Sequence, residues 1–213
     1  GYAMAVSRCE SGHANRVSKP NTNASRDFGV FQINDGGTLQ AALRALGVGR
    51  GDRVGLWLPM GLEAALALLA VAHLGGIAVP IFSGYGAEAA ALRLKDAEAK
   101  LLIVQDGFLR RGRRVELLPE ARKARAMAGT EKVAVVRRLG LPLEEEADLA
   151  ALAGPLSPPE EMESMDPFML IYTSGTTGRP KGVMHTHQGL LSVTRSIVDY
   201  LDARESDVVL SVL

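Results

Sequence analysis

Residues 47–82 read GVGRGDRVGLWLPMGLEAALALLAVAHLGGIAVPIF, and this stretch decides the fold class. Arg53 to Leu58 is a short apolar run that predicts a buried strand. Leu62 to Leu74 has the length of a helix and is stopped by Gly75-Gly76, after which Ile77 to Phe82 predicts a second strand. Strand, helix and strand in this order, with both strands apolar throughout, indicate parallel pairing in a sheet that is covered on both faces.

The alternation of helices and strands continues on both sides of this stretch. The further predicted helices are Thr38 to Leu46, Ala87 to Ala97, Pro119 to Met127 and His187 to Leu201. The further predicted strands are Lys100 to Gln105, Lys132 to Val136, Phe168 to Thr173, Val183 to His185 and Val208 to Leu213. The sequence therefore predicts an α/β fold with a mostly parallel sheet and helices on both of its faces.

One segment interrupts the alternation. Leu141 to Met165 contains Glu144-Glu145-Glu146, followed by Pro155 and Pro158-Pro159, which suit neither a helix nor a strand. We expect this segment to be a solvated loop or linker with one helical turn at most, and we assign its acidic run no function.

The composition excludes several classes of protein. The 213 residues are 47% hydrophobic and 23% charged, which is ordinary for a globular protein, and 24 basic residues balance 24 acidic ones. This neutral balance favours neither nucleic acid nor an anionic membrane as a partner. The single cysteine, Cys9, excludes an internal disulfide and fits a reducing compartment, so we expect a cytoplasmic protein. Leu62 to Phe82 is long enough to cross a bilayer, but Glu63, His73 and Pro80 favour a buried helix and a strand instead.

The stretch that is most informative about function is Tyr172-Thr-Ser-Gly-Thr-Thr-Gly-Arg-Pro-Lys-Gly-Val183, directly after a predicted strand. Its glycines let the backbone approach a ligand closely, and successive free N–H groups then form a concave anion site. Lys181 adds a compact charged donor that suits phosphate. Hydroxyl donors are added by Thr173, Ser174, Thr176 and Thr177. The segment therefore has the parts needed to hold a polyphosphate, and the alternative is a flexible Ser/Thr/Gly loop without a ligand.

The spacing of this loop is not that of a Walker A motif. That motif places Gly-Lys-Ser/Thr after four spacer residues, and here the second glycine would fall at Pro180 or at Val183.

The sequence YTSGTTGRPKGV, followed by HTHQGLL, resembles the signature loop of the adenylate-forming superfamily, which includes acyl-CoA synthetases, luciferases and peptide-synthetase adenylation domains. Residues 47–82 resemble the first helix-strand-helix-strand segment of that family, so the resemblance extends over about 38–213. It implies an AMP-binding, ATP-dependent ligase in which Lys181 is the candidate catalytic residue of the phosphate loop. It also implies that the loop closes over the β- and γ-phosphates of ATP through Thr173, Ser174, Gly175, Thr176, Thr177, Gly178 and Lys181.

The resemblance implies a two-step reaction on a small carboxylic acid. The carboxylate attacks the α-phosphorus of ATP and pyrophosphate leaves, after which a thiol, usually that of coenzyme A, captures the acyl-adenylate. Donors on the departing phosphates stabilise charge that grows in the transition state, and Mg²⁺ would share that task. The sequence names no metal ligand: His185 and His187 are too few for a zinc site and are expected to be structural.

Residues 83–97 and 101–107 resemble the acetyl- and propionyl-CoA synthetase branch of this family. In that branch a short basic segment follows, similar to Leu109-Arg-Arg-Gly-Arg-Arg-Val115, whose arginines contact the phosphates of coenzyme A. By position Arg110 and Arg113 match those arginines, and guanidinium groups suit phosphates. The alternative is a solvated basic turn.

Residues 1–35 resemble a different family, namely the active-site stretch of lysozymes and lytic transglycosylases. The resembling parts are Cys9-Glu-Ser-Gly12 and the run from Asn21 to Asn34. The resemblance makes Glu10 the general acid and Asp27 the second carboxylate, and the alternative is that both are surface acids. About 35 residues cannot build such a core alone. We therefore divide the chain into a fragment, 1–37, that does not fold independently, and a partial AMP-binding domain, 38–213, joined by a fused or misassembled reading frame.

Three functions compete at this stage. The first is an acid–thiol ligase of the acyl-CoA synthetase type, present as an incomplete fragment. The second is a peptidoglycan-cleaving enzyme that uses Glu10, and the third is a nucleotide-binding module that keeps Lys181 without completing catalysis.

We expect the purified 213-residue chain to be poorly soluble and catalytically inactive. The family's adenine-facing segment, ribose-binding carboxylate and C-terminal catalytic lysine have no counterpart in it, and an unpaired sheet edge would favour self-association. Pyrophosphate release and thioester formation from ATP, a panel of carboxylic acids and coenzyme A measure this directly. Robust acyl-CoA formation by the purified chain would contradict it.

Overall fold

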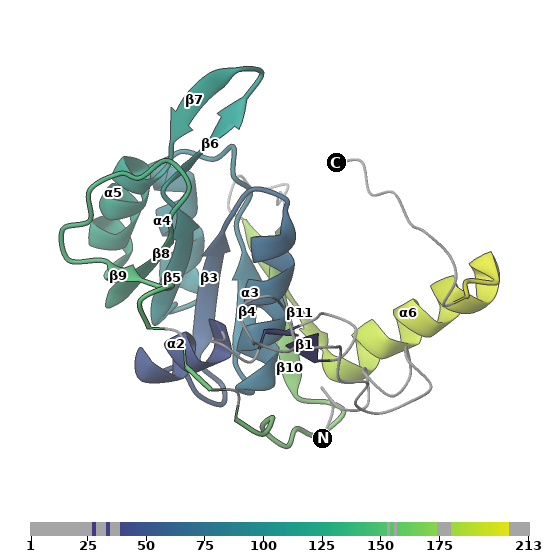
Figure 1. Cartoon of the computed structure of the whole chain (residues 1–213). Coiled ribbons are helices and arrows are strands. Elements are labelled where there is room, and N and C mark those ends of the chain that lie inside the picture. The colour runs from purple at the N-terminus through teal and green to yellow at the C-terminus, as the bar shows by residue number, and fades with distance from the viewer. Residues whose placement is uncertain are drawn as a thin grey trace.

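The computed structural model describes residues 27–28, 33–34, 39–152, 154–155, 157–173 and 180–204. Its centre is a seven-stranded sheet with the order β11-β10-β4-β3-β5-β8-β9 (Figure 1). The strands are β3 (Arg53–Trp57), β4 (Ile77–Pro80), β5 (Leu101–Gln105), β8 (Lys132–Val136), β9 (Ala147–Asp148), β10 (Pro167–Thr173) and β11 (Lys181–Thr186). All neighbouring strands pair in parallel except β10 and β11, which are antiparallel. The predicted α/β fold with a mostly parallel sheet is confirmed.

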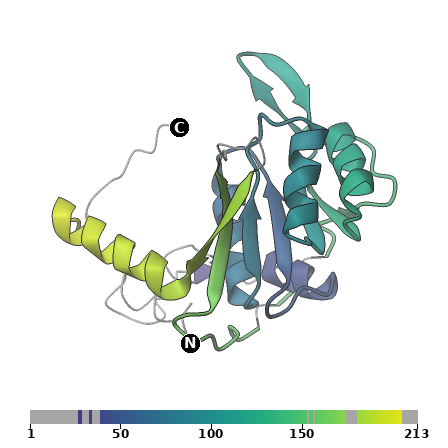
Figure 2. The ribbon, with the colours of Figure 1, turned by 180° about the vertical axis from the view of Figure 1, so that it is seen from behind.

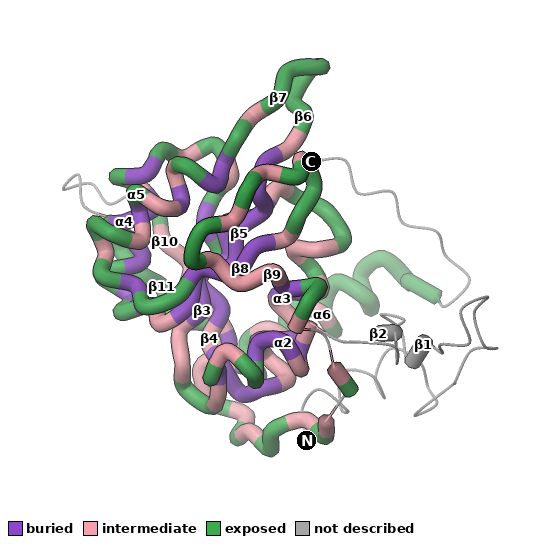
Figure 3. The backbone as a smooth tube through the Cα atoms, turned by 60° about the vertical axis from the view of Figure 1, so that its left-hand side comes forward, coloured by how far each residue is buried: buried purple, intermediate pink, exposed green. Residues whose placement is uncertain are grey.

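Helices cover both faces of the sheet, as the apolar strands predict. In Figure 1, α2 (Leu39–Ala45) and α3 (Leu62–His73) lie on the near face, and Figure 2 shows α4 (Ala87–Asp96) and α5 (Leu118–Ala128) on the opposite face. Strand β5 alternates between the two: its first and third residues pack with α2 and α3, and its second and fourth pack with α4 and α5. All five residues of β5 are buried, and Figure 3 shows the burial concentrated along the central strands.

Helix α4 approaches the sheet closely at Gly55 in β3. A Cβ atom built on Gly55 would lie 2.5 Å from Cδ2 of Leu94 in α4 and 3.1 Å from Cδ1 of Leu102. Any side chain at this position would therefore force the Leu94 and Leu102 side chains to move from their packed positions.

The predicted linker, Leu141 to Met165, is only partly the solvated loop that its composition indicates. It contains β9, and the side chain of Glu146 is only 4% exposed. The Glu146 carboxylate accepts hydrogen bonds from Nε and Nη2 of Arg122 in α5, at 2.6 and 3.2 Å. Treating the whole acidic run as a wet surface was wrong for Glu146, because a long-range partner on α5 neutralises its charge.

The second half of this segment is tied to the helices on the other face. Gln40 of α2 donates to Oγ of Ser157 at 2.5 Å, and the backbone N–H of Ser157 donates to Oε1 of Gln40 at 3.2 Å. The His73 ring at the end of α3 lies 2.8 Å from the Ser157 carbonyl oxygen. These contacts satisfy the polar side chain of Gln40, which is buried in α2 together with Ala42 and Leu43.

The last described helix, α6 (His187–Leu201), follows β11 directly and projects from the body of the molecule (Figure 1). The Thr186 side chain caps it by accepting a hydrogen bond from the Gly189 N–H at 3.1 Å. Its exposed apolar residues include Val193, Ile197 and Tyr200. Strand β11 is the edge strand of the described sheet at this end, which is compatible with self-association there. Self-association itself stays a prediction.

Some of the predicted features fall outside the described residues, including the strand at 208–213 and nearly all of 1–37. Within 1–37 the structure describes only the backbone pairing of β1 (Asp27–Phe28) with β2 (Ile33–Asn34), in antiparallel register. Among the helices that the structure describes, none has the length and hydropathy that crossing a bilayer requires.

The Arg122–Glu146 pair generates a prediction about stability and pH. The hydrogen bond from Arg122 lowers the pKa of Glu146 from 4.5 to about 2. Since the folded state then holds its proton less tightly than the unfolded state, this contribution is complete above pH 4.5 and is lost as the pH falls towards 2. Glu146→Gln should lower the free energy of unfolding by about 1–2 kcal/mol at pH 7 and flatten its fall in acid.

Urea unfolding followed by circular dichroism between pH 3 and pH 7 measures this. The matched control is Glu145→Gln, because Glu145 pairs with Arg125 while its side chain is 78% exposed. The control should change the free energy of unfolding by less than about 0.5 kcal/mol. Equal effects of the two substitutions on the free energy of unfolding would show that the burial of Glu146 does not strengthen its contribution to stability.

Candidate functional site

The carboxyl ends of the parallel strands meet along one side of the sheet, which we call the carboxyl edge. The β10–β11 loop opens at this edge, and so do the segments that follow β3, β4, β5 and β8. The hairpin of β6 (Gly107–Arg110) and β7 (Arg113–Glu116) follows β5 and rises above the edge at the top of Figure 1. In open parallel sheets the carboxyl edge is where ligands bind.

The predicted phosphate loop starts and ends within the β10–β11 hairpin. Thr173 and Lys181 are the last register pair of this hairpin, so the two ends of the loop stand side by side at the carboxyl edge. Lys181 is exposed, and it forms no ion pair with any residue that the structure describes. Its ammonium group is therefore available for an anion. The other predicted phosphate ligands, 174–178, lie outside the described residues.

A tyrosine directly before the loop reaches across to a helix. The Tyr172 hydroxyl donates a 2.5 Å hydrogen bond to Oδ2 of Asp96, at the end of α4. Burial and the neighbouring Asp96 carboxylate raise the pKa of Tyr172, so its hydroxyl stays protonated at neutral pH and remains a donor.

The basic segment after β5 forms a two-stranded hairpin whose arginines are exposed, and its binding of coenzyme A stays a prediction. Register pairs place Arg110 opposite Arg113, and Leu109 opposite Arg114. Residues paired in this way share one face of a ribbon, so Arg110 and Arg113 lie on the same face. Arg114 lies on the other face, where its Nε is 3.1 Å from Oε1 of Glu116.

This arrangement leaves two like charges facing each other. Neither Arg110 nor Arg113 forms an ion pair with any described residue, and both are exposed. Like charges opposite one another destabilise a strand pair. The pair Arg110 and Arg113 is thus suited to an anion that bridges both guanidinium groups.

Asp106 fixes the base of this hairpin. Its carbonyl oxygen accepts the N–H groups of Leu117 and Leu118, which follow β7, at 2.9 and 3.1 Å. Its buried carboxylate accepts the N–H groups of Arg138 and Leu139 in the turn after β8, at 2.7 and 3.0 Å. Burial raises the pKa of Asp106, but these amide hydrogen bonds outweigh it and hold that pKa below its usual range. A single residue thus joins the ends of β5, β7 and β8.

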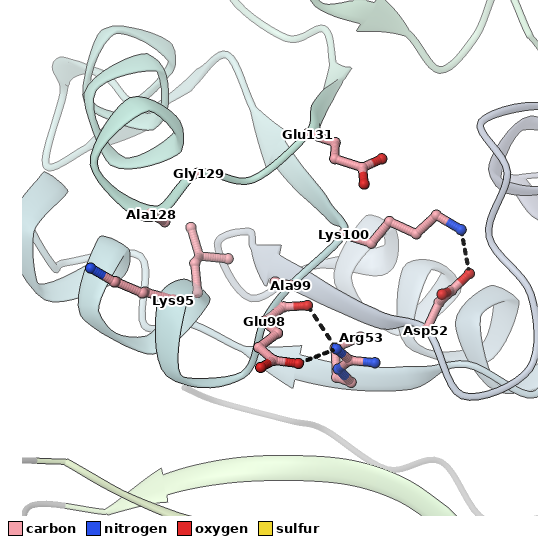
Figure 4. Close-up of a pocket in the computed structure, with 10 residues that line it drawn as sticks. Asp52, Arg53, Lys95, Glu98, Ala99, Lys100, Ala128, Gly129 and Glu131 are labelled. Carbon is pink, nitrogen blue, oxygen red and sulfur yellow. Dashed lines mark hydrogen bonds and ion pairs between the residues drawn. The ribbon is translucent and has the colours of Figure 1, made fainter.

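A hollow in the described part of the chain lies elsewhere. It has a volume of about 500 Å³ and is lined by residues at the amino ends of β3, β5 and β8 (Figure 4). Lys100 pairs with Asp52 at 2.8 Å and Arg53 pairs with Glu98 at 3.1 Å, so most of its charges are neutralised internally. No predicted site residue lines this hollow. It lies at the amino ends of the parallel strands, whereas the two ends of the phosphate loop, Thr173 and Lys181, stand at the carboxyl edge.

The comparison with known families fits the carboxyl-edge geometry. A family profile described as "AMP-binding enzyme" matches residues 38–213, which is most of the chain. The chain belongs to the AMP-binding enzyme family.

Two relatives of the chain are synthetases of coenzyme A esters. This AMP-binding enzyme chain is 40% identical over 200 residues to an acetyl-coenzyme A synthetase of Streptomyces avermitilis, an alignment that covers 87% of the chain and 30% of the relative. A 3-hydroxypropionyl-coenzyme A synthetase of Metallosphaera sedula is 39% identical over 178 residues, covering 78% of the chain and 27% of the relative. The chain thus spans less than a third of the length of either relative.

A solved structure supports the same fold. The acetoacetyl-CoA synthetase from Streptomyces lividans superimposes with a TM-score of 0.67 at 31% sequence identity, covering 72% of the chain and 24% of that protein. The resemblance of this AMP-binding enzyme to acyl-CoA synthetases, first inferred from residues 47–82 and the phosphate loop, is confirmed.

The other candidate residues of this AMP-binding enzyme chain are either outside the described residues or part of other contacts. Glu10 and the side chain of Asp27 lie outside the described residues. His187 packs edge-to-face on Phe168, with ring centroids 5.3 Å apart, whereas His185 is exposed in β11. Within the described residues no group of three metal-binding side chains gathers, so no residue is assigned to a metal.

Sequence reasoning missed Tyr172, Asp96 and Asp106 as contributors to the site. Tyr172 stands at the start of the loop sequence, where nothing local predicts a partner, and Asp96 lies 76 positions away from it. One signal could have drawn attention to Asp106: an acid that directly follows an apolar, buried strand has to be satisfied by hydrogen bonds.

Proposed function

We propose that this chain is the part of an acyl-CoA synthetase that holds the leaving phosphates of ATP and the phosphates of coenzyme A. The whole enzyme would activate a small carboxylic acid as an acyl-adenylate and transfer the acyl group to coenzyme A. The observation that carries the proposal is the β10–β11 hairpin, whose final pair, Thr173 and Lys181, opens the phosphate loop at the carboxyl edge. Family membership and the names of the relatives support the reaction class.

In the first step a carboxylate oxygen of the acid attacks the α-phosphorus of ATP. The new bond gives the acyl-adenylate, and the bond to the bridging oxygen breaks to release pyrophosphate. The Lys181 ammonium and the loop amides are suited to stabilise charge on that leaving group, which grows as the bond breaks. Mg²⁺, when bound to the phosphates, would neutralise part of the same charge.

In the second step the thiol of coenzyme A attacks the acyl carbon, forms a thioester and releases AMP. Arg110 and Arg113 would bind phosphate groups of coenzyme A from one face of the β6–β7 hairpin. Neither arginine has a carboxylate partner among the described residues, and this supports the role, because a guanidinium group already paired with an acid would be a weaker phosphate ligand. The hairpin follows β5 directly, so it stands at the same edge of the sheet as the phosphate loop.

A small acid is the substrate class that we propose. The relatives are named for the coenzyme A esters of acetate, 3-hydroxypropionate and acetoacetate, which are all short acids. The peptidoglycan-cleaving alternative gains no support, because the family match starts at residue 38, after Glu10 and Asp27.

Lys181→Ala should weaken binding of inorganic pyrophosphate with Mg²⁺ to the 213-residue chain by about 10-fold, since one charge-assisted contact to phosphate is removed. Isothermal titration calorimetry measures the affinity. Lys95→Ala is the matched control, because Lys95 lines the hollow at the opposite side of the sheet. Equal affinities of the wild-type and Lys181→Ala chains would exclude Lys181 from the phosphate site.

Charge reversal of Arg110 and Arg113 together should weaken coenzyme A binding by at least about 10-fold, and the loss should shrink at high salt because these charges are exposed. Fluorescence anisotropy of a labelled coenzyme A, measured at 50 and 500 mM NaCl, tests this. The control is Arg114→Glu, on the opposite face of the same hairpin, which should have less than about a 3-fold effect. If Arg114→Glu has the larger effect, the face assigned to coenzyme A is wrong.

A further inference from the structure

The upper half of the β10–β11 hairpin is poorly supported by the rest of the sheet. β10 pairs with β11 from Pro167 to Thr173, but it has only one register pair with β4, Met169 with Ala78. On its other side β11 pairs with none of the strands that the structure describes, and it is the edge strand of the described sheet. The end of the hairpin that carries the phosphate loop therefore receives little positioning from strand pairing.

Pro80 explains why the pairing between β4 and β10 stops. The N–H groups of Ile77 and Ile81 donate to carbonyl oxygens of the β3 segment, at 2.8 and 2.9 Å. Since amides along a strand alternate in direction, the amides of positions 78 and 80 point towards β10. Proline has no N–H, so position 80 cannot supply the next hydrogen bond to β10.

Helix α4 supplies a contact in place of this missing pairing. The Tyr172 hydroxyl donates to the Asp96 carboxylate, one residue before the loop begins. The buried Arg93 guanidinium lies 4.2 Å from the centre of the Tyr85 ring and 6.0 Å from that of Tyr172. Arg93 is itself held by the Ala89 carbonyl oxygen at 2.6 Å and donates to the Tyr85 hydroxyl at 3.2 Å. We call the set Tyr85, Arg93, Asp96 and Tyr172 the tyrosine clamp.

We propose that Tyr172 and Asp96 are positioning residues for the phosphate loop, fixing through α4 the place where Thr173 and Lys181 stand. The inference rests on the proposed phosphate-binding role of that loop. Tyr172 is bonded directly to Thr173 and pairs in register with Gly182, the neighbour of Lys181, so one side-chain contact controls both ends. Misplacing a set of phosphate donors by as little as about 1 Å can cost a large factor in binding or rate.

Three substitutions in the 213-residue chain separate the bond from the packing. Tyr172→Phe keeps the ring beside Arg93 and removes only the hydroxyl, Asp96→Ala removes the acceptor, and Asp96→Asn keeps an acceptor oxygen without the charge. The matched control is Glu98→Gln, two residues along the same helix end, where the side chain is 83% exposed. The readouts are the affinity for inorganic pyrophosphate with Mg²⁺ by calorimetry, hydrogen exchange of the peptide covering 170–186, and the melting temperature.

Tyr172→Phe and Asp96→Ala should each weaken pyrophosphate binding by about 3- to 10-fold and raise hydrogen exchange in 170–186, while the melting temperature stays close to that of the wild type. The double variant should lose no more than either single variant, because both remove the same bond. Asp96→Asn should recover part of the loss, and Glu98→Gln should match the wild type. If Tyr172 and Asp96 only stabilised the fold, their substitution would lower the melting temperature, and Asp96→Asn would not recover part of the pyrophosphate affinity.

Two outcomes would overturn the inference. One of them leaves the proposed phosphate-binding function standing, and the other overturns that function too. If the wild-type chain binds pyrophosphate and Tyr172→Phe binds it equally well, the clamp does not position the loop and the proposed function stands. If the wild-type chain does not bind pyrophosphate, the phosphate role of the loop is wrong and the positioning role fails with it.

Discussion

The burial of β3 and β5 on both faces is the constraint on which the rest of the structure depends. A strand that is apolar on both sides has to be covered by helices above and below, and those helices return the chain so that the strands run in parallel. As a consequence every one of these strands ends at the same side of the sheet. The carboxyl edge therefore collects the phosphate hairpin, the basic hairpin and the turn held by Asp106, which are far apart in the sequence.

The groups at this edge are held by contacts of different kinds. Asp106 is buried and fully bonded to backbone amides, so the base of the basic hairpin is fixed by the core of the domain. The phosphate hairpin has one register pair with β4, and a hydrogen bond from Tyr172 to Asp96 of α4 supports the end that carries the loop. Substitutions at Asp96 of α4 would therefore change the position of the phosphate loop without changing the strand pairing of the sheet.

Much of the fold could be predicted from the sequence, because apolar runs and glycine stops are local signals. Arg53 to Leu58 and Leu62 to Leu74 match β3 and α3 to within one residue at each end. The hairpin of β6 and β7 was missed because its strands are rich in arginine and carry no apolar alternation, and its turn depends on positive φ at Arg111 and Gly112. Of the candidate site, the sequence supplied the residue types. It could not supply the clamp or the Glu146 contact, since both join positions that only the tertiary fold brings together.

The face-to-face placement of Arg110 and Arg113 has a further consequence, for ionic strength. Dissolved salt screens exposed charges, so it relieves the repulsion between these two guanidinium groups and stabilises the ribbon they sit on. The same screening weakens their attraction for any phosphate group. At high salt the hairpin is thus best ordered by itself but binds an anion least well. In dilute buffer the two guanidinium groups repel each other, and a bound anion would complete the ordering of the hairpin.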